Sequence, residues 1–215
     1  ERGKEKQMMI DWIRELRKDK QLKNKIKRRL EEFSSFKDKG NKEWFSELCF
    51  CILTANSKAV TAISIQDELG AGGFLDLTRE KLSEAIRRNR HRFHNNKAGF
   101  IIEARKYSDI KDRLRKFNDN KEKREWIADN IKGLGFKEAS HFLRNTGHFD
   151  LAVLDRHILN ILSEEKYLRE IPKTLSKKTY LQIEKKLEKI CGELKMNQAE
   201  LDLYLWFEKT GKVLN

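Results

Sequence analysis

Proline and glycine are both scarce in this sequence, which has one proline, Pro172, and 11 glycines among its 215 residues. Collagen-like repeats, proline-rich segments and many-turned β proteins need far more of both, so these architectures are excluded. Strand-like alternation is also nearly absent, whereas apolar residues recur at helical spacing, as at Ile10, Ile13 and Leu16. The sequence therefore predicts an all-α protein.

Cysteine is scarce as well, with only Cys49, Cys51 and Cys191. An odd number, with two of them close together in an apolar run, makes neither a disulfide framework nor a four-ligand zinc site. We expect a reduced protein in which Cys49 and Cys51 fill the core from a buried helix over about residues 42–55. The histidines of the second half lack the spacing of a helical zinc pair, so no metal is expected.

Long apolar runs are missing too. No stretch of about 18 apolar residues exists, so no membrane-spanning helix is expected. The segment from Glu1 to Met8 is charged and lacks the apolar centre of a secretion signal. Because Met8 and Met9 follow so soon after Glu1, residues 1–8 are interpreted as an upstream or added segment.

Charge of one sign is abundant. Lys and Arg total 47 and Asp and Glu total 34, which gives 47 − 34 = +13. Such a field attracts polyanions, of which nucleic acid is the commonest, although ribosome association, anionic lipid and general solubility are alternatives. The interleaved Lys and Glu fit a protein from a thermophile. The 38% of apolar residues supply a real core.

The stretch from Ile131 to Ala139 places two glycines between two predicted helices. Gly133 and Gly135 can adopt backbone angles that other residues avoid, and they flank Leu134, which can insert between the helices. The first amides of the second helix then point outward, where they can bind a DNA phosphate without reading the base sequence. The alternative is an ordinary corner with a glycine cap.

Two charged residues follow at helix starts. Lys137 lies in the first turn after the hairpin, where the positive end of the helix dipole disfavours the protonated amine. That place suits an amine nucleophile, and a solvated surface lysine is the alternative. Asp155 ends an apolar run and opens another helix as a favourable N-cap, and the simplest interpretation gives it no further role.

Together these elements resemble the helix-hairpin-helix DNA glycosylase superfamily. The lysine and the aspartate are 155 − 137 = 18 residues apart, and Lys132 stands where many members have proline. Two further segments make the chain similar to the archaeal type of 8-oxoguanine DNA glycosylase/AP lyase along nearly all its length. The segments that carry the resemblance are Gly133 to Lys137, Val153 to His157, Ile52 to Ser57 and Arg92 to Ala98.

The order of the predicted helices favours two helical lobes facing a groove. The resemblance implies an enzyme that excises 8-oxoguanine and then cuts the strand by β-elimination, with no cofactor. Lys137 would attack the anomeric carbon as a free amine and form a Schiff base. Asp155 would stabilise the oxocarbenium-like sugar. Related branches carry four cysteines near the end for an iron–sulfur cluster, whereas only Cys191 lies in that half here, so no cluster is expected.

The resemblance also assigns residues to the lesion and to DNA. Phe93 and Trp206 would flank the extruded base and Lys212 would belong to its pocket, although both aromatic residues also fit a packing role. Asn56 would insert near the gap left in the duplex, or else cap a helix. The DNA-binding residues are expected to be Asn56, Lys132, Gly133 and Gly135.

The expected lobes are residues 9–60 with 165–215, and residues 61–164, with the hairpin motif at about 122–147. The expected partner is double-stranded DNA containing oxidised guanine, bound by a monomer in the cytoplasm with the nucleoid. Two other functions stay open. A non-enzymatic hairpin module would need the glycines but neither Lys137 nor Asp155, and a glycosylase for oxidised pyrimidines would keep both with a different pocket.

Overall fold

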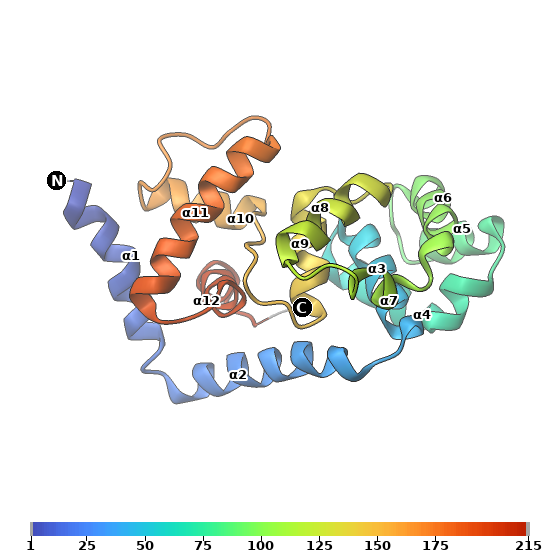
Figure 1. The fold of residues 1–215 in the computed structure, drawn as a ribbon, viewed down its shortest axis with the longest axis horizontal. Coiled ribbons are helices and arrows are strands. Elements are labelled where there is room, and N and C mark those ends of the chain that lie inside the picture. Colours follow the sequence, from blue (N-terminus) through green and yellow to red (C-terminus); the bar gives the residue numbers. More distant parts are fainter. Residues whose placement is uncertain (1, 214–215) are drawn as a thin grey trace. The chain divides into compact units, whose positions relative to one another are not determined.

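The computed structural model describes the backbone of residues 2–213 and the side chains of residues 8–213. All regular structure over this range is helical (Figure 1), which confirms the all-α prediction. The interpretation of residues 1–8 falls largely on positions outside the described side chains and stays a prediction. The helices are α1 (Arg2–Leu16), α2 (Lys20–Ser35), α3 (Asn41–Thr54), α4 (Ala59–Asp76), α5 (Arg79–Arg88), α6 (His94–Ala104), α7 (Ile110–Leu114), α8 (Asn120–Asn130), α9 (Phe136–Asn145), α10 (Arg156–Glu164), α11 (Lys177–Leu194) and α12 (Gln198–Thr210), with 3-10 turns η1 (Phe36–Asp38) and η2 (Arg105–Tyr107).

The chain divides into two compact units. Unit 1 comprises residues 1–34 and 147–215, and unit 2 comprises residues 35–146. The expected division, 9–60 with 165–215 and 61–164, has the same order along the chain but other boundaries. Helix α3 packs against α4 and α9 and so belongs to unit 2, whereas α10 packs against α12 and belongs to unit 1. Each unit therefore has its own helical core.

Helix α3 is the centre of unit 2, as predicted for residues 42–55. Every residue from Trp44 to Thr54 is buried, and both Cys49 and Cys51 are fully enclosed. Burial raises the pKa of each of these thiols well above its usual range. The two cysteines are thus neutral core side chains in this unit.

Two breaks in unit 2 differ from the predicted pattern. A single helix is expected from about Asn96 to Phe117, but the chain forms α6, η2 and α7 instead. The side chain of Asn41 accepts a hydrogen bond from the backbone N–H of Lys111 at 3.0 Å, so a distant residue fixes the start of α7. A loop is expected over residues 70–73, but the break is confined to Gly70, whose φ is 57° and ψ −176°.

Unit 1 packs its N-terminal helices against its C-terminal ones. Leu22, Ile26 and Phe33 of α2 form one buried cluster with Leu203 and Tyr204 of α12. The sequence predicts two final helices over about residues 177–194 and 198–208, and α11 and α12 lie there. Ser176 and Asn197 supply their N-cap hydrogen bonds. Among the helices that the structure describes, none is long and apolar enough to cross a membrane.

Candidate functional site

The hairpin between α8 and α9 depends on one glycine in particular. Gly133 has a φ of 89°, in the left-handed region that favours glycine. A Cβ atom at Gly133 would lie 2.5 Å from Cδ2 of Phe100, so a side chain there would collide with the α6 ring. Leu134 is buried between the helices, as predicted. Phe100 is a contact that sequence spacing gave no signal to find.

Gly135 does not have the unusual backbone angles that are expected of both glycines. Its φ is −100° and its ψ −168°, an extended conformation open to any residue, so unusual backbone angles are needed only at Gly133. Gly135 is the N-cap of α9, and its amide donates to Oε2 of Glu138 at 3.2 Å. Lys132, which precedes the hairpin, is exposed and pairs with Glu103 at 3.0 Å. Lys132 therefore lies on the open side of the hairpin.

Lys137 lies in the first turn of α9, as predicted, with a side chain that is 27% exposed. Its Nζ is 3.4 Å from Oε1 of Glu138, whose side chain is 18% exposed. One carboxylate thus contacts both the hairpin amide of Gly135 and the amine of Lys137. The same carboxylate is the feature of this site that the sequence prediction missed.

A second lysine lies close to this group. Lys97 is only 4% exposed, and its Nζ donates to the carbonyl oxygen of Ile52 at 2.6 Å, at the C-terminal end of α3. Burial lowers the pKa of Lys97 to about 8; the carboxylate of Glu138 opposes this shift and the charge of Lys137 adds to it. The carboxylate of Glu138 therefore contacts the amine of Lys137 and acts electrostatically on that of Lys97.

Asn56 and Phe93 lie beside the same end of α3. Asn56 follows the helix in a left-handed conformation with a φ of 60°, and its side chain is exposed. Phe93 is 40% exposed, with its ring centroid 6.4 Å from that of His91. His91 in turn contacts the carbonyl oxygen of Leu53 through Nε2 at 2.9 Å. A buried imidazole thus supports an exposed aromatic ring.

Asp155, in unit 1, is the N-cap of α10, and its Oδ1 accepts from the backbone N–H of Ile158 at 2.9 Å. Two buried side chains of α11 hold the segment that leads to it. Oε1 of Glu184 accepts from the N–H of Ala152 at 2.9 Å. The hydroxyl of Tyr180 donates to the carbonyl oxygen of Ala152 at 2.6 Å and accepts from the N–H of Leu154 at 3.2 Å. Asp155 is therefore held by its own N-cap hydrogen bond and by the hydrogen bonds that Tyr180 and Glu184 make to the preceding segment.

Trp206 of α12 lies beside the same turn. Its ring meets that of His157 edge to face, with the centroids 4.8 Å apart and the planes at 89°. His157 is two residues after Asp155, and the sequence predicts that it orders the Asp155 turn. The ring contact places Trp206 beside this turn as well. Lys212 lies elsewhere in unit 1, in an open groove with Lys25 and Arg28 of α2.

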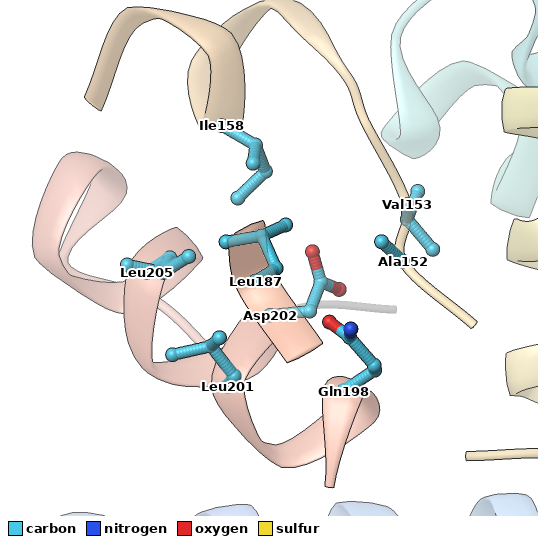
Figure 2. Close-up of a pocket in the computed structure, with 8 residues that line it drawn as sticks. All are labelled: Ala152, Val153, Ile158, Leu187, Gln198, Leu201, Asp202 and Leu205. Carbon is cyan, nitrogen blue, oxygen red and sulfur yellow. The ribbon is translucent and has the colours of Figure 1, made fainter. Parts of the chain in front are cut away.

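A small pocket lies between α12 and the segment that leads to Asp155 (Figure 2). Gln198 and Asp202 point into it, among side chains that are otherwise apolar. Gln198 is 5% exposed, and its Nε2 has no hydrogen-bond partner among the described residues. Gln198, Asp202 and Trp206 are spaced by four residues, which places them along one face of α12. No group of three or more His, Cys, Asp or Glu residues that could hold a metal ion occurs within residues 8–213.

Comparison with known proteins decides the family. The family model described as 8-oxoguanine DNA glycosylase matches residues 26–196. The chain belongs to this family. Its relative from Methanocaldococcus jannaschii, named 8-oxoguanine DNA glycosylase/AP lyase, is 52% identical over 207 residues, or 96% of this chain and 99% of the relative. The resemblance seen in the sequence is thereby confirmed.

Solved structures of this 8-oxoguanine DNA glycosylase family agree. A crystal structure of the M. jannaschii 8-oxoguanine glycosylase/lyase in complex with 15mer DNA containing 8-oxoguanine has a TM-score of 0.94 at 50% identity, covering 97% of this chain and all of that one. The 8-oxoguanine DNA glycosylase of Thermotoga maritima has a TM-score of 0.91 at 38% identity, covering 98% of this chain and all of that one. An endonuclease III complex at 16% identity and a TM-score of 0.56 shares the fold alone.

Proposed function

We propose that this protein removes 8-oxoguanine from double-stranded DNA and cleaves the resulting abasic strand as a bifunctional DNA glycosylase and AP lyase. The observation that carries the proposal is the amine of Lys137 in the first turn directly after the Gly133 hairpin, in a chain of this family. A hairpin that only gripped the DNA backbone would need no lysine there. We also propose that it works as a monomer, in the cytoplasm with the nucleoid.

The chemistry begins with extrusion of the damaged nucleotide, which costs a few kcal/mol of stacking and pairing. Attraction between phosphates and the surplus of +13 offsets that cost. The lone pair of the neutral Lys137 amine then attacks the anomeric carbon while the bond to the base breaks, and the base leaves with the bonding electrons. The carboxylate of Asp155, held by its N-cap hydrogen bond and by the segment that Tyr180 fixes, stabilises positive charge on the sugar.

The new secondary ammonium loses one proton, and its lone pair then expels the ring oxygen as the sugar ring opens. The ring oxygen takes up a proton, and the product is a protonated Schiff base. Its positive charge acidifies the neighbouring C2′ position, so that removal of a C2′ proton expels the 3′ phosphate by β-elimination. Water then releases the lysine and leaves the cleaved strand. Both the removal of the base and the elimination proceed through the nitrogen of Lys137, so one residue serves both activities.

For recognition, we propose that Phe93 and Trp206 flank the extruded purine and that Lys212 belongs to its surroundings. The exposure of Phe93 and the supported ring of Trp206 favour these roles. We further propose that Asn56 enters the gap in the duplex, which its exposed left-handed turn favours. Lys132 and the hairpin at Gly133 and Gly135 would hold the phosphate backbone.

The test uses duplexes with a single modified base and borohydride, which reduces a Schiff base to a stable covalent complex. We expect trapping with 8-oxoguanine and none with Lys137→Gln. Trapping with an oxidised pyrimidine alone would instead identify a pyrimidine glycosylase. Binding without trapping on any lesion would identify a non-enzymatic DNA-binding module and overturn the proposal.

A further inference from the structure

The contact between Lys137 and Glu138 is unusual for consecutive residues of a helix. Side chains at i and i+1 point about 100° apart around the axis and do not face each other. Here Glu138 is drawn back toward the N-terminus because its Oε2 accepts from the Gly135 amide at 3.2 Å. That bend brings Oε1 to 3.4 Å from Nζ of Lys137. The hairpin and the amine are therefore joined through one side chain.

Helix capping alone accounts for only half of this arrangement. A Glu at the third helical position often bonds the N-cap amide, which stabilises the helix start. Capping needs a single acceptor oxygen, and glutamine would supply it equally well. The second oxygen and the negative charge act only on Lys137 and on charges nearby. These two parts of the side chain can be separated by substitution.

The surroundings make this carboxylate the counter-charge of two amines. Buried Lys97 of α6 lies in the field of both Glu138 and Lys137, which act on it in opposite directions. Cys51 of α3 is a neutral thiol, because burial raises its pKa. Other charged groups near α9 are Glu47 of α3, Arg124 of α8, which lies over the Phe136 ring, and Arg144 of α9 itself.

We infer that Glu138 is a positioning residue that holds the Lys137 amine against the N-cap of α9 and so fixes its place. This inference rests on the proposed function. A lysine side chain has four rotatable bonds, and an unrestrained amine would spend most of its time away from any one attack position. Because Glu138 also accepts a hydrogen bond from the Gly135 amide, the position of the Lys137 amine depends on the hairpin.

Two substitutions and one control test this. Glu138→Gln keeps an acceptor for Gly135 and removes the charge, whereas Glu138→Ala removes both. Glu103→Gln is the matched control, because Glu103 pairs with Lys132 beside the same hairpin but not with Lys137. Each variant is compared with the wild type in thermal midpoint, in affinity for an undamaged duplex and in the single-turnover rate of borohydride trapping on 8-oxoguanine DNA across pH.

A readout that needs no DNA is added. The rate at which an amine-directed acylating reagent modifies Lys137 at a fixed pH, followed by peptide mass spectrometry, reports how freely the amine is available. Removing the carboxylate releases the amine from its partner, so Lys137 should be acylated about two- to tenfold faster in Glu138→Gln than in the wild type. The plateau trapping rate should fall about tenfold, because the amine is no longer held.

For Glu138→Gln we expect a thermal midpoint within about 2 °C of the wild type and duplex affinity within about twofold, together with faster labelling and slower trapping. Glu103→Gln should show neither change. The inference is overturned if Glu138→Gln labels and traps like the wild type, or if its trapping falls only in step with its thermal midpoint, since capping would then explain everything. If the wild type traps no lesion, the proposed function fails, while the labelling rate still decides the role of Glu138.

Discussion

The ammonium of Lys97 and the carbonyl oxygen of Ile52 meet 2.6 Å apart in the interior of unit 2. This contact caps the C-terminal end of α3, where the helix dipole places negative partial charge. The favourable contact comes with a cost, because a buried ammonium loses its hydration. The balance lowers the pKa of Lys97 to about 8.

That pKa predicts how stability depends on pH. The unfolded chain holds the Lys97 proton up to about pH 10.5, so between about pH 8 and 10.5 it binds more protons than the folded chain. The contribution of Lys97 to the free energy of unfolding therefore rises with pH across that window, by up to about 3 kcal/mol. We expect the difference in unfolding free energy between the wild type and Lys97→Met to grow by this amount in urea titrations. A difference for Lys97→Met that does not change with pH would contradict the assignment.

The two glycines of the hairpin should differ sharply in their tolerance of alanine. Gly133→Ala places a Cβ atom 2.5 Å from the Phe100 ring in a left-handed conformation, so we expect a loss of about 2–4 kcal/mol in unfolding free energy. Gly135→Ala puts its Cβ 3.5 Å from Oε2 of Glu138 in an extended conformation and should cost less than about 1 kcal/mol. Denaturant titration of the pair measures this. Equal losses would show that the positive φ of Gly133 does not govern the hairpin.

The hydroxyl of Tyr180 should be needed to hold Asp155 in place. Tyr180→Phe leaves the buried carbonyl of Ala152 and the N–H of Leu154 without this partner, which should cost about 1–3 kcal/mol. We also expect slower borohydride trapping at saturating enzyme, because the segment leading to Asp155 loses the two hydrogen bonds that Tyr180 makes. Tyr107→Phe, in unit 2, is the control for removing a hydroxyl. Unchanged stability and unchanged trapping in Tyr180→Phe would show that this hydroxyl does not hold Asp155 in place.

Sequence patterns predicted the parts of the site that local chemistry determines. Asp155 caps α10 as expected, because an aspartate before an apolar helical run can satisfy the first amides by itself. The break after α6 could not be predicted, since it depends on Asn41, 70 residues away from Lys111. The partner of Lys137 was missed for a related reason. Neighbouring residues on a helix normally diverge, and only the N-cap hydrogen bond draws Glu138 toward the amine.

Trp206 should separate the two proposed activities. Stacking on the extruded base matters only while a base is present, whereas cleavage of an abasic site needs the amine and the sugar alone. Trp206→Leu keeps an apolar side chain on α12 and removes the ring that meets His157. Loss of base stacking is worth about 1–3 kcal/mol, so excision of 8-oxoguanine should slow by about 5- to 150-fold. Cleavage of a preformed abasic duplex should stay within about threefold of the wild type. Parallel single-turnover assays on the two duplexes measure the split, with Lys137→Gln as the control that loses both. If abasic cleavage falls as far as excision does, then Trp206 supports the Asp155 turn through His157, and the base is recognised by other residues.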